Sequence, residues 1–138
     1  MAVTHTLPHN TPTARTTGIA AVSIAAAASA TGDDIDNATN KDTHADIELA
    51  ATFGTAPAAG APVQIHLIYK MDGTNAETVV QHLAGVVGMA DVTSAQRAVV
   101  SVPILPYKFA IRVTNGTAQT ANPVTVTCNT RRAAVDAV

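Results

Sequence analysis

The chain has 138 residues, which is long enough for one compact domain with short additional segments. It carries 8 basic and 10 acidic residues, a net charge of -2, and no basic run longer than Arg131–Arg132, which argues against a protein that binds nucleic acid through phosphate contacts. The single cysteine, Cys128, argues against a scaffold held by intrachain disulfides, and no apolar run approaches the ~20 residues that span a bilayer. We therefore expect neither nucleic acid nor a membrane as a partner.

The composition predicts a core without large rings. Hydrophobic residues make up 47% of the chain, but 28 of them are alanine, and aromatic residues make up only 3%. The charged fraction, 13%, is about half of the usual quarter. A small domain of this kind is marginally stable alone, and burial against a partner is one physical way to stabilise it.

The first 17 residues are rich in threonine and contain two prolines. Such a segment cannot bury enough surface to order itself, so we expect residues 1–17 to form an extended arm that lies against another subunit or a larger assembly. The apolar run 18–28 ends in a small-residue motif typical of signal-peptide cleavage sites. Because the run is mostly alanine and follows a long leader with one arginine, we favour a strand there.

Alternating apolar and polar residues predict strands farther along the chain. In 45–53, the polar face carries Asp46 and Glu48, and 63–70 alternates in the same way up to the turn sequence 72–75. Strand-like runs also cover 98–103, 108–113 and 124–129, the last with Cys128 on its apolar face. The polar segment 31–42 is predicted to be a loop, and Asn115–Gly116 is typical of a hairpin turn.

Residues 76–90 fit two interpretations. Their valines and Leu83 form a helical stripe, but two glycines and four valines weaken a helix. We favour a strand, with Val80, His82, Ala84 and Val86 on one face. The whole pattern is then about seven strands without a long helix, which predicts an all-β, antiparallel β-sandwich of the jelly-roll type over 18–130, followed by a C-terminal tail over 131–138.

Residues that carry catalytic or metal chemistry are scattered. The five histidines lack a nearby second ligand at strand or helix spacing, so surface histidines are the better interpretation. The acidic segment 33–37 resembles a calcium loop in composition, but the glycine and glutamate positions of an EF-hand are Thr39 and Ala45. Cys128 fits a buried thiol better than a nucleophile. We therefore expect no enzymatic activity, no metal and no cofactor.

Three arginines, Arg15, Arg131 and Arg132, lie in or beside the two terminal segments. They either keep the chain soluble or dock it on an acidic partner, to which a planar guanidinium binds through two parallel hydrogen bonds. Both interpretations stay open, and these three residues are the candidate partner-binding site.

Several motifs together suggest a family. The segment 45–75, with the FGTAP element at 53–57 and the DGTN turn at 72–75, resembles capsid cement or decoration proteins of tailed bacteriophages. The segments 92–100, 102–119 and 124–131 fit the same pattern, so the resemblance covers about residues 43–131. In size and alanine content the chain is similar to a jelly-roll cement protein of this family.

The resemblance implies a β-sandwich on the outer surface of a capsid, in the virion, that bridges and stabilises neighbouring subunits of the major capsid protein. It also implies self-association, and we expect a homodimer because two-fold contacts are the commonest kind. The alternative is a module of a phage tail or fibre that binds the host surface. Glycan sites commonly present exposed aromatic rings, and Tyr107 is the one aromatic residue here that lies off an apolar face.

Overall fold

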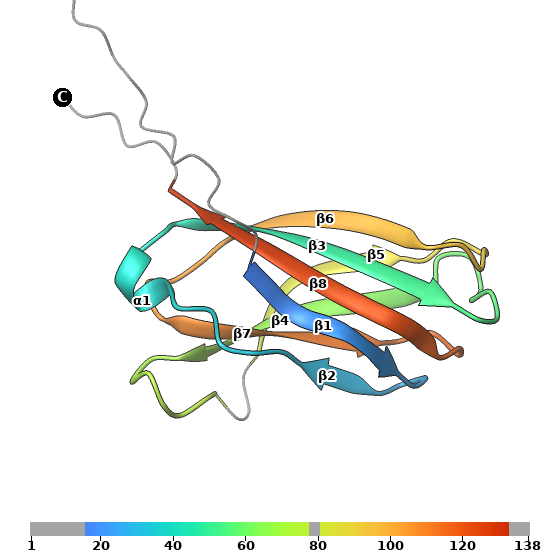
Figure 1. The fold of residues 1–138 in the computed structure, drawn as a ribbon, viewed down its shortest axis with the longest axis horizontal. Helices are drawn as coiled ribbons and strands as arrows, with labels where there is room; N and C mark the ends of the chain where they lie inside the picture. Colours follow the sequence, from blue (N-terminus) through green and yellow to red (C-terminus); the bar gives the residue numbers. More distant parts are fainter. Residues whose placement is uncertain (1–15, 78–80, 133–138) are drawn as a thin grey trace, which may run out of the picture.

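The computed structural model describes residues 16–77 and 81–132, which form two facing antiparallel sheets (Figure 1). Sheet A has the strand order β1-β8-β3-β6, and sheet B has the order β2-β7-β4-β5. The strands are β1 Thr16–Ile24, β2 Ser29–Thr31, β3 His44–Phe53, β4 Pro62–Lys70, β5 His82–Gly88, β6 Gln96–Pro103, β7 Lys108–Asn115 and β8 Ala121–Arg131. Every connection except the one from β4 to β5 passes from one sheet to the other, which is the jelly-roll arrangement, so the predicted fold class is confirmed.

The core lies between the sheets and follows from the alternation in the sequence. Each inward residue of β3 is at most 1% exposed, and Phe53 at its end packs in the same core as Phe109 of β7. The largest fully buried side chains are Phe53, Phe109, Ile24, Ile47, Leu49, Ile65, Leu67, Ile111, Val63, Val113, Val124 and Val126. Aliphatic side chains from both sheets therefore supply most of the apolar burial.

The structure corrects the predicted strand number. Eight strands lie in the described residues instead of about seven, because β2 forms a short pair with β7 that has only three residues. The strand favoured in 18–28 is present as β1, but it spans Thr16–Ile24, so it begins inside the predicted arm 1–17 and ends before residue 28. The rest of that arm, residues 1–15, lies outside the described residues.

The polar segment 31–42 contains a short helix that the loop prediction did not include. Helix α1, Asn37–Asn40, begins after Asp36, whose side chain accepts hydrogen bonds from the N–H groups of Ala38 and Thr39. Asn37 is fully buried, and its amide donates to the carbonyl oxygens of Asp42 and Leu105. Asp36 thus caps the helix, and Asn37 ties it to the segments before β3 and after β6.

The hairpin expected at Asn115–Gly116 is wrong. The chain leaves β7 of sheet B at Asn115 and enters β8 of sheet A, so the connection crosses between the sheets. Asn115 is 1% exposed and its amide donates to the carbonyl oxygens of Ile24 and Gln119, while its Oδ1 accepts from Thr117. The buried side chain of Asn115 therefore stabilises a connection between the sheets, although the local sequence is typical of a two-residue hairpin turn.

The strand preferred over a helix in 76–90 is present as β5, but its predicted face is wrong. A register shift in the pairing of β4 with β5 falls between Ile65 and His66. His82 pairs with the inward residue Leu67 and contacts the Tyr69 ring, whereas Val86 pairs with Gln64 and is 52% exposed. The extra residue in the bulge turns the two side chains to opposite faces. Val80 lies outside the described residues.

Candidate interaction surface

Two of the three candidate arginines lie at the end of β8. Arg131 is the last residue of that strand and Arg132 follows it, with side chains 42% and 57% exposed. Arg15 lies outside the described residues. The structure thus places two guanidinium groups on one edge of the sandwich, where both reach solvent.

Arg131 is bound to a carboxylate on the neighbouring strand of sheet A. Its Nε lies 3.0 Å from Oδ2 of Asp46, and the Ser101 hydroxyl of β6 donates to Oδ1 of the same carboxylate. These hydrogen bonds, the one from Arg131 first, hold the pKa of Asp46 below its usual value. Three strands are therefore joined across the outer face of the sheet by one ionised group.

A second ion pair lies beside the first on the same face. Nη1 of Arg97 on β6 is 3.2 Å from Oε1 of Glu48 on β3. Asp46 and Glu48 alternate on one side of β3, so their side chains are neighbours along the strand. We call Asp46, Glu48, Arg97, Ser101 and Arg131 the paired-charge row.

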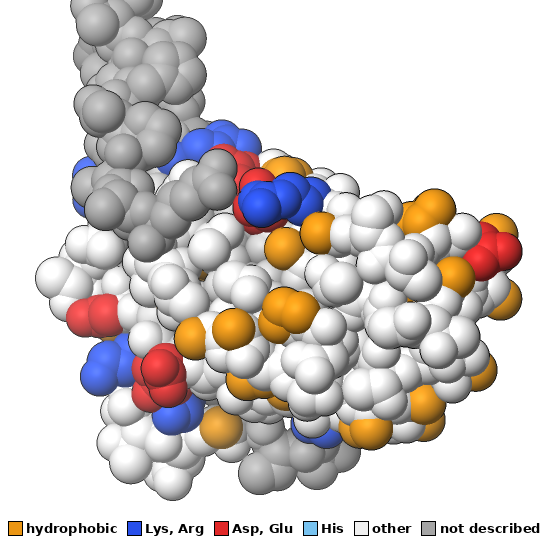
Figure 2. Space-filling model, turned by 45° about the vertical axis from the view of Figure 1, so that its right-hand side comes forward, with side chains coloured by type: hydrophobic (Ala, Val, Ile, Leu, Met, Phe, Trp, Pro, Cys, Tyr) orange, Lys and Arg blue, Asp and Glu red, His pale blue; other side chains and the backbone are white. Residues whose placement is uncertain are grey.

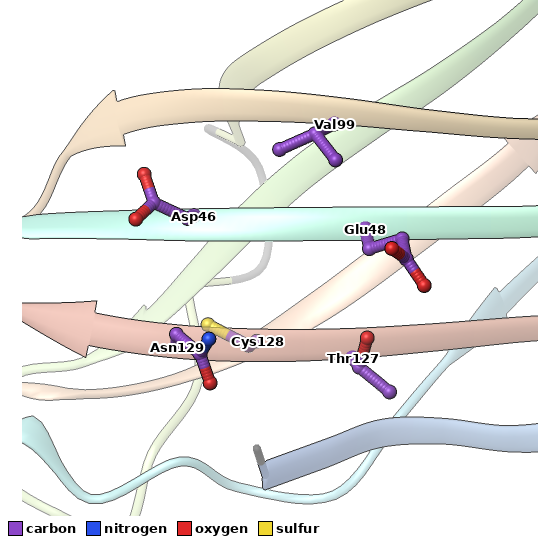
Figure 3. A pocket seen from close by; sticks show the side chains of 6 residues that line it. All are labelled: Asp46, Glu48, Val99, Thr127, Cys128 and Asn129. Carbon is purple, nitrogen blue, oxygen red and sulfur yellow. The ribbon is translucent and has the colours of Figure 1, made fainter. Parts of the chain in front are cut away.

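A small depression lies between the two carboxylates and β8 (Figure 3). Figure 3 shows Asp46 and Glu48 along β3, with Val99 of β6 on one side and Thr127 and Asn129 of β8 on the other. Its volume of about 50 Å³ accommodates a few waters, whereas sites for organic ligands usually measure hundreds of Å³. The depression on the outer face of sheet A is thus too small for an organic ligand.

Arg132 forms a hydrogen bond and an ion pair with the segment that precedes β3. Its Nη2 donates to the carbonyl oxygen of Asn40 at 2.8 Å, and its Nε lies 3.8 Å from Oδ1 of Asp42. Thr130 of β8 also donates to the Asp42 carboxylate. Arg132 therefore has a structural role, although more than half of its side chain remains available to a partner.

The two described ends of the chain meet at this edge. Thr16, where residues 1–15 join β1, pairs with Cys128, and β8 continues from there to Arg131. The sequence could not show this closeness, because 115 positions separate Thr16 from Arg131. We call Thr16, Asn40, Arg131 and Arg132 the terminal edge.

Charged side chains are unevenly spread over the surface. Figure 2 shows most of them in the upper and left parts of the view, while much of the remaining surface is uncharged and its hydrophobic atoms are scattered. In the described residues, the most exposed large hydrophobic side chains include Met71, Val99, Leu83 and Val86. Val99 belongs to β6 and lies between the charged members of the paired-charge row.

Cys128 lies on the inner side of β8, as predicted. It is 2% exposed, and burial raises the pKa of its thiol to about 12. Within residues 16–77 and 81–132, no group of three or more His, Cys, Asp or Glu side chains is placed to hold a metal ion. No helix in the same part of the chain is long and apolar enough to cross a membrane.

The sequence identified Arg131 and Arg132 as candidates but not their partners. The carboxylates of Asp46 and Asp42 lie 85 and 90 positions away in the chain, and strand pairing brings them to the arginines. The alternation in β3 did place Asp46 and Glu48 on its polar face. Which arginine pairs with which carboxylate depends on the register of β3 with β6 and β8, and the sequence carries no local signal for that register.

Comparison with known proteins adds no family to this description: no protein-family model matches the chain, and no curated protein matches it.

Proposed function

We propose that this chain is a structural cement, or decoration, protein on the outer surface of a bacteriophage capsid. In this role it bridges neighbouring subunits of the major capsid protein as a homodimer and stabilises their contact without catalysing a reaction. The proposal combines the jelly-roll fold with the resemblance carried by residues 43–131.

The terminal edge is the observation that supports the proposal best. The connections to residues 1–15 and 133–138 start from the same end of the strands of sheet A, beside the exposed parts of Arg131 and Arg132. A capsid subunit that contacts this edge therefore lies beside the points where both terminal segments join the sandwich and beside both guanidinium groups. When one protein binds through several linked contacts, the first contact raises the effective concentration at which the others form.

The paired-charge row supports a contact surface over a catalytic one. Asp46 accepts hydrogen bonds from Arg131 and Ser101, and its lowered pKa keeps it ionised at neutral pH. A catalytic acid requires the opposite change, a raised pKa in a cavity that holds substrate. A face whose charges are already compensated by ion pairs is instead suited to packing against another protein surface.

The first experiment measures the amount of the chain in virions of the phage that encodes it. Mass spectrometry is applied separately to tail-free heads and to isolated tails. A copy number in fixed proportion to the major capsid protein in heads is the expected result. Presence in tails alone contradicts the proposal and favours the tail or fibre alternative, and absence from both excludes a virion role.

A second experiment tests the terminal edge. Heads that lack the chain are mixed with the wild-type protein, with a variant lacking residues 1–15, or with Arg132→Glu, and bound protein is measured after sedimentation. Both variants should bind less, whereas Arg112→Glu, the same charge change on β7 of sheet B, should bind as the wild type does. Equal loss with Arg112→Glu would show an effect of net charge alone.

A further inference from the structure

The four edge strands of the sandwich differ in how well they can pair with another strand. Unpaired N–H and C=O groups at a sheet edge form a template for a further strand, and most proteins make such edges short or irregular. Here β2 has three residues, the register of β1 with β8 shifts at three places, and β5 is bulged and contains Gly85 and Gly88. Three of the four edges therefore carry a feature that hinders pairing.

Strand β6 lacks these features. It pairs with β3 in an unbroken register from His44↔Pro103 to Ala51↔Gln96, without a bulge. It contains no lysine, and its proline is at its last position. Among the described residues no strand pairs with its other side. In the described part of the chain, this edge is therefore long, regular and open.

The side chains of β6 alternate strictly between the two faces. Arg97, Val99 and Ser101 are exposed on the outer face of sheet A, and Val99, in the middle, is 63% exposed. Ala98, Val100 and Val102 are partly buried on the inner face. The exposed apolar residue thus lies at the centre of the strand, with a cation toward one end and a hydroxyl toward the other.

We propose that β6 pairs with β6 of a second copy of this chain, antiparallel, with the two-fold axis at Val99. The two copies of sheet A then form one eight-stranded sheet across the dimer. This inference specifies the contact within the homodimer of the proposed function. It rests on the proposed function only for the role of the dimer in the virion.

The sequence of the strand favours this register. A two-fold axis through the sheet pairs residues of the same face, so Val99 meets Val99 of the second copy and Arg97 meets Ser101 of the second copy. Pro103, which has no N–H to donate, stays outside the paired segment. Shifting the axis to Val100 would instead place Arg97 opposite Pro103 of the second copy.

The charges of the strand complement themselves in this arrangement. The Ser101 hydroxyl already donates to Asp46, so its oxygen can accept a hydrogen bond from the Arg97 guanidinium of the second copy. The two Arg97 side chains are four residues apart along the ladder, about 14 Å, so like charges do not meet. This complementarity is why a second copy, and not an unrelated strand, is the proposed occupant.

The first test measures the mass of the chain in solution by light scattering. The wild type should reach twice the 14.0 kDa of one chain, and Val99→Lys should weaken the dimer about tenfold or more, because two lysines face each other at the axis. Val86→Lys, an equal change at an exposed position of β5, is the matched control and should leave the dimer intact. A wild type that stays monomeric at about 1 mM overturns the proposal, as does a dimer lost only with Val86→Lys.

The second test fixes the register by a disulfide. Val99→Cys should cross-link to itself on mild oxidation, because residues opposite each other at the axis have Cα atoms within disulfide range. In this register the two Ser101 residues lie four positions apart along the ladder, so Ser101→Cys should not cross-link to itself. The native Cys128 is buried and gives little background. Cross-linking of Ser101→Cys without Val99→Cys overturns the proposed register.

The outcomes separate this inference from the proposed function. A chain that dimerises through Val99 but is absent from virions supports the β6 contact and contradicts the cement role. A Val99→Lys monomer that still binds heads as tightly as the wild type supports the contact and shows that bridging does not depend on it.

Discussion

Arg131 and Asp46 form an ion pair at 3.0 Å that joins the last residue of β8 to the outer face of β3. One of the candidate partner-binding residues is therefore part of the sandwich itself. A partner that binds this edge contacts an arginine whose guanidinium is already oriented, which lowers the entropy cost of binding.

The pair should contribute modestly to stability. Its side chains are 42% and 32% exposed, and solvent screens ion pairs of this kind. A double-mutant cycle with Arg131→Ala and Asp46→Ala, followed by urea unfolding, should give a coupling free energy of about 0.5–1 kcal/mol. A coupling near zero would show that the pair only orients Arg131.

Acid should remove this contribution. The pKa of Asp46 is lowered in the folded chain, so the stabilisation is complete above the ordinary value of 3.8 and is lost as pH falls through the folded value. The difference in the free energy of unfolding between the wild type and Asp46→Asn, measured at about pH 5.5 and about pH 3, should therefore be smaller at the lower pH. A gap that is unchanged or wider at low pH contradicts this assignment.

Asn115 should be among the most sensitive polar residues. It is 1% exposed, and its amide group bonds to the backbone of two segments, at Ile24 of β1 and at Thr117 and Gln119 in the connection to β8. Asn115→Ala leaves these groups unsatisfied, and should lower the free energy of unfolding by about 2–4 kcal/mol. Asn40→Ala, at an exposed position, is the control and should cost less than about 1 kcal/mol. Similar losses in the two variants would contradict the proposed role.

Gly32 should be irreplaceable for a steric reason. A Cβ atom there would lie 1.7 Å from the carbonyl oxygen of Gly18, which belongs to the backbone of β1. Gly32→Ala must displace the main chain and should lower the thermal unfolding midpoint strongly. Gly54→Ala places its Cβ in open space, and its midpoint should stay within a few degrees of the wild type. A small effect at Gly32 would show that the segment after β2 moves easily.

Cys128 should be unreactive until the chain unfolds. Its thiol is 2% exposed and its pKa is raised to about 12, so little thiolate is present at neutral pH. A thiol reagent should label it at the rate of unfolding, and Cys128→Ser should cost about 1–3 kcal/mol because it buries a hydroxyl. Fast labelling of the folded protein, or loss of head binding with unchanged thermal unfolding, would contradict a purely structural thiol.

The local sequence predicted the strands that have one buried face and one face toward solvent. Residues 45–53 alternate cleanly, and 63–70 alternate in the same way except at Ile68, which is buried on the face away from the core; the structure confirms both as β3 and β4. The buried position of Cys128 follows from the same alternation in β8. The repeat of short strands without a long helix sufficed to predict an all-β sandwich.

Errors arose where a distant segment changes what a local pattern means. Asn115–Gly116 has the sequence of a hairpin turn, but the buried amide of Asn115 binds Ile24, 91 positions away, and directs the chain to the other sheet. The register of β4 with β5 shifts at a bulge, which places Val86 on the opposite face of the strand from His82, whereas the sequence predicted the same face for both.

By itself, therefore, the sequence determined the strand periodicity, the apolar core and the two described arginines of the candidate site. Tertiary structure alone decided that Arg131 meets Asp46, that Thr16 lies near the end of β8, and that β6 is an open edge. The physical reason is that burial alternates along a strand and is visible locally, whereas pairing and register join segments tens of residues apart.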